Sequence, residues 1–151
     1  MSLPYENATS GKSAVDEMQK ILRGFGASSF GCLEDFEKGE VLVQFTHRGR
    51  SVVIRASSHG YAAAWLKHHP YSARMRGTPL GHEVKAKKIG QIAVYSILRD
   101  WIKGQITAVE VGMMSFEGAF LGQILLPDGL TVLERVQKSG TLSLSAPSPA
   151  T

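Results

Sequence analysis

The feature that most constrains this chain is a long run of apolar residues at helical spacing between Gly81 and Met113. Apolar side chains recur every three or four residues through this run, which places them in one stripe along a helix. A helix of this length draws most of its stability from packing, so we expect the other elements to fold against it. The stripe consists of Ile92, Tyr95, Leu98, Ile102, Ile106, Val109 and Met113.

Two shorter patterns precede the long helix. Apolar residues at helical spacing up to residue 25 predict an N-terminal helix, with Ser13 as its cap. Between residues 28 and 56 the period changes to two, and turn residues interrupt the alternation at 37–39 and 47–50. This alternation is typical of a three-stranded antiparallel meander.

Further helices are expected on both sides of the long one. The alanine-rich segment 60–69 favours a helix, whereas the basic segment 71–80 lacks periodicity and predicts a mobile loop. Beyond the long helix, Ser115 is expected to cap a helix that reaches Ile124, and residues 130–136 to form a short strand or helix. The fold class is therefore α+β: an N-terminal helix, a three-stranded antiparallel β-meander, and a helical C-terminal half with one long amphipathic helix.

The length of 151 residues suits one hydrophobic core. We expect a flexible arm over residues 1–12, a single α+β domain over residues 13–138, and a disordered tail over residues 139–151. One cysteine excludes an intramolecular disulfide, which suits a reducing cytoplasm. No apolar run is long enough for a transmembrane helix, and no secretory signal is recognisable, so we expect no membrane partner.

Positive charge is concentrated in one third of the chain. Nine basic residues and one acidic residue lie between Thr46 and Gly90, a net charge of +8, while the rest of the chain carries −4. Aromatic residues are interleaved with these cations, a combination that suits phosphate contacts and base stacking on single strands. The candidate nucleic-acid-binding residues are Arg48, Arg50, Arg55, Tyr61, Trp65, Lys67, Arg74, Arg76, Lys85, Lys87 and Lys88. The alternative is a solvated basic face with Tyr61 and Trp65 packed in the core.

Three other patterns are weaker candidates for chemistry. The paired His68 and His69 match no metal-binding spacing, since adjacent residues on a helix point in different directions. Acidic residues around the turn at 37–39 could serve a metal-dependent nuclease, but neighbouring Glu34 and Asp35 would face opposite sides of a strand. Cys32 lacks a histidine pattern that would mark it as a nucleophile. We therefore expect no catalytic residue, no metal and no cofactor.

Several segments stand out together in the last third of the chain: Ser96–Lys103, Val109 with Gly112, Ser115–Glu117, Ala119–Leu121, Leu125–Gly129 and Thr131-Val132. With the N-terminal helix ending in Phe25-Gly26, and Phe45 and Gly49-Arg50 in the meander, this pattern resembles a family of small proteins encoded by phages and prophages. The resemblance covers residues 13–136 and carries no catalytic motif. It implies a phage setting, and hence the cytoplasm of a bacterial host.

Two hypotheses of function follow. The first is a phage-derived, non-enzymatic nucleic-acid-binding protein that assists recombination or replication on single-stranded DNA. The order helix, meander, helix, long helix is similar to that of annealing proteins in which DNA follows a basic groove. The second is a phage adaptor or inhibitor that binds a host or phage protein, or a further copy of itself, through its helical half. Its apolar surface would include Met113, Met114, Phe116 and Phe120, which core packing explains equally.

Overall fold

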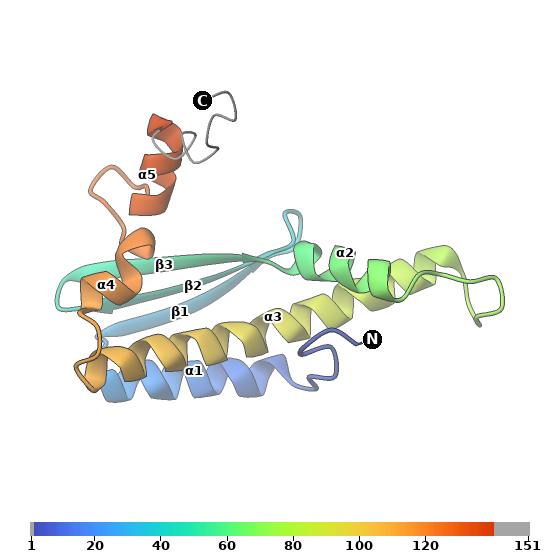
Figure 1. Cartoon of the computed structure of the whole chain (residues 1–151), viewed down its shortest axis with the longest axis horizontal. Coiled ribbons are helices and arrows are strands. Elements are labelled where there is room, and N and C mark those ends of the chain that lie inside the picture. Colours follow the sequence, from blue (N-terminus) through green and yellow to red (C-terminus); the bar gives the residue numbers. More distant parts are fainter. Residues whose placement is uncertain (1, 141–151) are drawn as a thin grey trace, which may run out of the picture.

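The computed structural model describes residues 2–140 and shows a three-stranded sheet with two long helices, α1 and α3, against one face (Figure 1). This arrangement confirms the predicted α+β fold. Most of the predicted tail, from residue 141 onward, lies outside the described residues. The elements are α1 (Gly11–Phe25), β1 (Ser29–Asp35), β2 (Glu40–His47), β3 (Arg50–Ser57), α2 (Ser58–His68), α3 (Pro79–Glu110), α4 (Phe116–Phe120), the 3₁₀ helix η1 (Leu121–Gln123) and α5 (Val132–Ser139).

The sheet is the predicted meander, with strand order β1-β2-β3 and antiparallel pairing throughout. Period-two alternation places Val41, Val43 and Phe45 on the face that the helices cover, and all three are at most 1% exposed. The β2–β3 turn consists of Arg48 and Gly49, whose φ angles are 50° and 77°. Two positive φ angles at the centre of a two-residue turn match the right-handed twist of the flanking strands.

The stripe on α3 is confirmed over most of its length. Leu98, Ile102 and Ile106 are buried against the sheet and α1. The helix ends at Glu110, however, and Gly112 takes a φ of 77°, so the predicted stripe does not continue to its last member, Met113. Met113 is instead 73% exposed.

A second, smaller core joins α2 to the first part of α3. Ala62, Trp65 and Ala86 are buried between the two antiparallel helices. Gly90 allows the helices to approach closely, since a Cβ atom at this position would lie 2.6 Å from the carbonyl oxygen of Ser58. We call residues 58–90, which comprise α2, the connecting loop and the start of α3, the helical hairpin. It projects beyond the end of the sheet (Figure 1).

The C-terminal segment covers part of the outer edge of β3. Ser115 caps α4 as expected, but α4 ends at Phe120 and is followed by η1 rather than by a helix that reaches Ile124. The reason is that the chain turns back along β3, where Leu125 donates a backbone hydrogen bond of 2.8 Å to the carbonyl oxygen of Ser51. Of residues 130–136, left open between strand and helix, those from Val132 onward belong to α5, and Thr131 precedes this helix as its N-cap in a capping box.

Candidate nucleic-acid interface

The candidate residues fall into groups at opposite ends of the sheet (Figure 1). Arg48 and Arg50 lie at the β2–β3 turn, while the eight candidates from Tyr61 to Lys88 belong to the helical hairpin at the other end. The eight-residue strand β2 separates the two ends by roughly 25 Å. Arg55 lies on β3, on the sheet face that α1 and α3 leave open. The basic third of the sequence therefore does not form one continuous surface.

Two of the strand arginines are engaged within the protein. Arg50 forms an ion pair with Glu117 of α4, and its guanidinium lies 5.5 Å from the ring centre of Phe116. The same contact lowers the pKa of the Glu117 carboxyl, because the arginine hydrogen bond favours its charged form. Arg55 Nε lies 3.6 Å from Glu134 Oε2 of α5. Both arginines therefore hold C-terminal helices on the sheet, which reduces the charge they can offer to phosphates.

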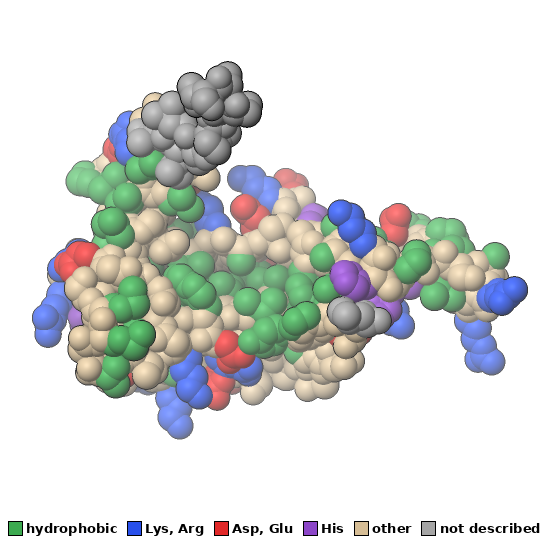
Figure 2. Space-filling model, viewed as in Figure 1, with side chains coloured by type: hydrophobic (Ala, Val, Ile, Leu, Met, Phe, Trp, Pro, Cys, Tyr) green, Lys and Arg blue, Asp and Glu red, His purple; other side chains and the backbone are tan. Residues whose placement is uncertain are grey.

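The cations of the helical hairpin differ in this respect. Within residues 2–140 none of them takes part in an ion pair. On α3 the lysines spread around the side opposite the buried Ala86 and Gly90, because successive residues of a helix are rotated by about 100°. Figure 2 shows Lys and Arg side chains projecting from the free end of the hairpin. These cations are Lys67, Arg74, Arg76, Lys85, Lys87 and Lys88.

The predicted stacking residues are less accessible than the cations. Trp65 is 5% exposed, and its ring lies 4.6 Å from the ring of His69 and 5.1 Å from that of His82, centre to centre. Tyr61 is half-buried and donates a hydrogen bond of 2.6 Å to the carbonyl oxygen of Pro4. In this structure, therefore, a base cannot stack on Trp65, and the alternative of core packing describes this residue correctly.

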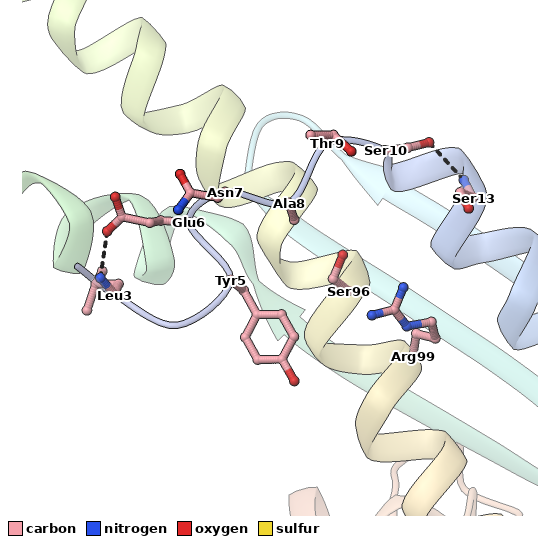
Figure 3. A pocket seen from close by; sticks show the side chains of 10 residues that line it. All are labelled: Leu3, Tyr5, Glu6, Asn7, Ala8, Thr9, Ser10, Ser13, Ser96 and Arg99. Carbon is pink, nitrogen blue, oxygen red and sulfur yellow. Dashed lines mark hydrogen bonds between the residues drawn. The ribbon is translucent and has the colours of Figure 1, made fainter.

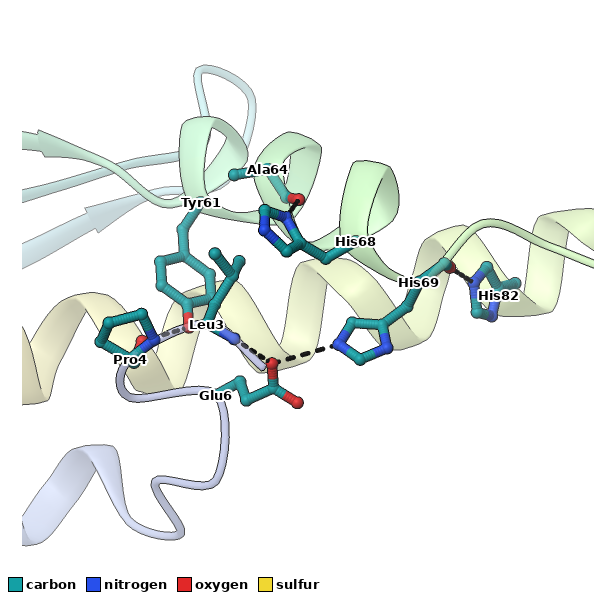
Figure 4. Close-up of polar contacts among 8 residues, drawn as sticks. All are labelled: Leu3, Pro4, Glu6, Tyr61, Ala64, His68, His69 and His82. Atoms are coloured by element: carbon teal, nitrogen blue, oxygen red, sulfur yellow. Dashed lines mark hydrogen bonds and ion pairs between the residues drawn. The ribbon is translucent and has the colours of Figure 1, made fainter. Parts of the chain in front are cut away.

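The N-terminal segment, residues 2–10, lies alongside the helical hairpin (Figure 4). Glu6 Oε1 accepts a hydrogen bond from the Leu3 N–H and lies 3.1 Å from His69 Nε2. The hydrogen bond from His69 is the main reason that the pKa of Glu6 is lowered. Farther along α3, Tyr5 donates a hydrogen bond of 2.6 Å to Asp100. The segment predicted as a flexible arm thus contacts both α2 and α3.

A polar pocket of about 380 Å³ lies between this segment and the helices (Figure 3). Residues of the segment, among them Tyr5 and Glu6, form one wall, while Ser96 and Arg99 of α3 form the other. Arg99 is already paired with Glu17 at 3.1 Å and with Asp100 at 2.9 Å. The charge of Arg99 is therefore already balanced within the protein.

A larger cleft of about 510 Å³ lies at the free end of the helical hairpin. Arg76 and Lys85 line it together with His82 and Met75, and the Lys85 ammonium lies 5.9 Å from the ring centre of Trp65. Sequence analysis missed this cleft, because it forms only where the loop folds back onto the start of α3. A local signal was present in Thr78-Pro79, since a threonine cap followed by proline marks a helix start.

Two acidic residues near the β1–β2 turn, Glu34 and Asp35, form hydrogen bonds within the protein. Glu34 accepts hydrogen bonds from Gln91 and Tyr95 of α3, while Asp35 Oδ1 accepts one of 3.0 Å from the backbone N–H of Lys38. Burial is the largest cause of the raised pKa of Tyr95 and of the raised pKa of half-buried Cys32. Among the residues that the structure describes, no three His, Cys, Asp or Glu side chains gather in a metal-binding arrangement.

No protein-family model, curated protein or solved structure matches this chain. The phage origin that the sequence resemblance implies therefore stays a prediction. In the described part of the chain, none of the helices combines the length and apolar character needed to cross a bilayer.

Proposed function

We propose that this chain is a phage-derived, non-enzymatic nucleic-acid-binding protein that engages single-stranded DNA through the helical hairpin, as an annealing or binding accessory in recombination or replication. The observation that carries the proposal is the set of six hairpin cations without an ion pair within residues 2–140. The hairpin has one acidic residue, Glu83, and a net charge of +5. Such a surface attracts phosphates by releasing their condensed counterions.

The surroundings of these cations favour a single strand over a duplex. Met75 and Leu80, at the free end of the hairpin, are 42% and 69% exposed, and half-buried Tyr71 lies on the same loop. Apolar and aromatic groups among cations can contact the faces of unpaired bases, which a duplex keeps stacked inside. We therefore assign the stacking role, which the sequence predicted for Trp65, to these residues at the free end of the hairpin.

The proposal is tested by fluorescence anisotropy with labelled single- and double-stranded DNA. The hairpin variant replaces Lys85, Lys87 and Lys88 by Gln; we expect it to bind single strands about 50-fold more weakly at 0.15 M salt, the effect of losing three phosphate contacts. The control variant replaces Lys12, Lys20 and Lys103 by Gln. These three lysines are also exposed, lie outside the hairpin and have no ion pair within residues 2–140, so total charge changes equally. Equal losses in both variants would contradict a hairpin interface.

An apolar surface near the end of α3 supports a second candidate function, the docking of a host or phage protein. Val111, Met113 and Leu121 are 68%, 73% and 54% exposed. Phe120 belongs to the core instead, since it is fully buried and its ring centre lies 5.4 Å from that of Phe45.

This candidate predicts a complex that survives nuclease treatment and is lost in Met113→Lys. The matched control is Met75→Lys, which adds the same charge at an exposed methionine of the hairpin. A complex that nuclease dissolves, or one that tolerates Met113→Lys, would count against it.

A further inference from the structure

Strand β1 presents an open edge. It pairs with β2 on one side, and within residues 2–140 no strand pairs with its other side. The outer edge of β3, in contrast, is partly covered by the hydrogen bond from Leu125 to Ser51. The pairing of β1 with β2 is continuous from Ser29 to Asp35, so no bulge distorts the strand. Its sequence, SFGCLED, also lacks the lysine and proline that commonly prevent edge strands from pairing with another chain.

Space is available along this edge, between β1 and α1. A hollow of about 190 Å³ lies beside the first half of β1 and is lined by Arg23 and Phe30, among others. A second hollow of about 470 Å³ lies beside the other half and includes Lys12, Cys32 and Glu34 in its lining. An additional strand can therefore approach the edge without displacing a helix.

The charges along the edge suit a second copy of the same strand. Arg23 of α1 lies beside the first half of β1, whereas the second half ends in Glu34 and Asp35, whose two negative charges outnumber the one positive charge of nearby Lys12. Antiparallel pairing of two copies brings the acidic end of each strand to the arginine of the other. A parallel arrangement would place like charges together, and it lacks the two-fold symmetry of a closed dimer.

On the open face of the sheet, the side chains of two paired β1 strands are also complementary in size. Leu33 is 62% exposed, and the position of a Cβ atom on Gly31 has no neighbouring atom within 4 Å. When two copies of β1 pair about the central residue, Cys32, Leu33 of each strand lies directly opposite Gly31 of the other. The leucine then covers the space that the glycine leaves open.

We propose that this protein forms a dimer through antiparallel pairing of β1 with β1 of a second copy, centred on Cys32, which joins two three-stranded sheets into one of six strands. The dimer does not depend on nucleic-acid binding. Its symmetry directs the two helical hairpins toward opposite ends of the joined sheet.

Molar mass by light scattering tests this proposal with the variants Gly31→Lys and Gln44→Lys. Gly31 and Gln44 are direct cross-strand partners, both exposed on the open sheet face, so the two variants add the same charge one strand apart. In the proposed dimer the two lysines at position 31 would lie about 7–8 Å apart across the new pair. We expect a dimeric wild type, a monomeric Gly31→Lys variant and a dimeric Gln44→Lys variant. A monomeric wild type, or a dimer that tolerates Gly31→Lys, would overturn the proposal.

Oxidation of Cys32 provides a second measurement that does not require the variant to fold. Directly opposite residues in an antiparallel pair have Cα atoms about 4.5–5.5 Å apart, within the range of a disulfide. Diamide, a diazene oxidant, would take two electrons and two protons from the paired thiols and become a hydrazine as the disulfide forms. On a denaturing gel we expect a covalent dimer that dithiothreitol converts to monomer, and the absence of this covalent dimer would overturn the proposed register.

Discussion

Replacing Gly90 by Ala tests the close contact between α2 and α3. The added Cβ atom would lie 2.6 Å from the carbonyl oxygen of Ser58 and 3.0 Å from the backbone nitrogen of Ala62. Both atoms belong to the backbone of α2, so no side-chain rotation can relieve the contact and the two helices must separate. Gly104, also inside α3, has no atom within 4 Å of the same position, which makes Gly104→Ala the matched control.

The expected magnitudes follow from two opposing effects. Alanine is favoured over glycine inside a helix by about 0.8–1 kcal/mol, and both variants gain this stabilisation. Overpacking of a tight contact costs about 1–3 kcal/mol, and only Gly90→Ala incurs this cost. We therefore expect Gly104→Ala to raise the free energy of unfolding by up to about 1 kcal/mol. Gly90→Ala should be less stable than Gly104→Ala by about 1–3 kcal/mol, the overpacking cost alone.

Urea denaturation followed by circular dichroism measures this difference directly. In thermal denaturation the same gap corresponds to midpoints about 2–12 °C apart for a chain of this length. Equal stability of the two variants would refute the argument, because it would mean that α2 and α3 are not in contact at Gly90.

Other expected outcomes concern the core, the capping of α5 and the N-terminal segment. Phe120→Ala should lower the free energy of unfolding by about 3–5 kcal/mol, since Phe120 is fully buried, whereas Phe36→Ala, at a residue 80% exposed, should change it by less than about 0.5 kcal/mol in the same urea assay. Hydrogen bonds from Thr131 lower the pKa of Glu134 in the folded protein, so their stabilisation is complete above the unfolded-state pKa and is lost as the pH falls through the lowered value. Amide exchange in α5 should therefore accelerate in acid, and Thr131→Ala should reduce this pH dependence without removing it, because the backbone N–H of residue 131 still donates to Glu134. Glu6→Ala, which removes the oxygen that accepts the hydrogen bonds from Leu3 and His69, should expose the N-terminal segment to limited proteolysis, and an unchanged cleavage rate would contradict its attachment at His69.

Local sequence patterns predicted the sheet and α3 well, because the spacing of apolar residues along a strand or helix determines which of its side chains face the core. The alternation of Val41, Val43 and Phe45 determines which face of β2 is apolar, whatever the rest of the chain does. Helix caps were less certain, since the hydroxyl of Ser10, rather than that of Ser13, caps α1. The two serines are three residues apart, and each fits the cap position by sequence alone.

Contacts between distant parts of the chain could not be predicted in this way. Arg50 and Glu117 are 67 residues apart in sequence, so their ion pair, which removes Arg50 from the unpaired cations, is visible only in the structure. The burial of Trp65 likewise depends on His82, which lies beyond the loop. The composition therefore predicted a basic region, but the tertiary fold determines which of its charges remain available.

The salt dependence of single-stranded DNA binding tests the central claim most directly, because its slope counts the phosphates that the protein neutralises. The account predicts that replacing Lys85, Lys87 and Lys88 by Gln reduces the slope of log K against log salt by about 2, at roughly 0.7 for each lost contact. Replacing Arg48 and Arg50 by Gln should reduce the slope by less than about 1, since Arg50 is already paired with Glu117. An unchanged slope in the lysine variant would contradict the proposal that the helical hairpin binds nucleic acid.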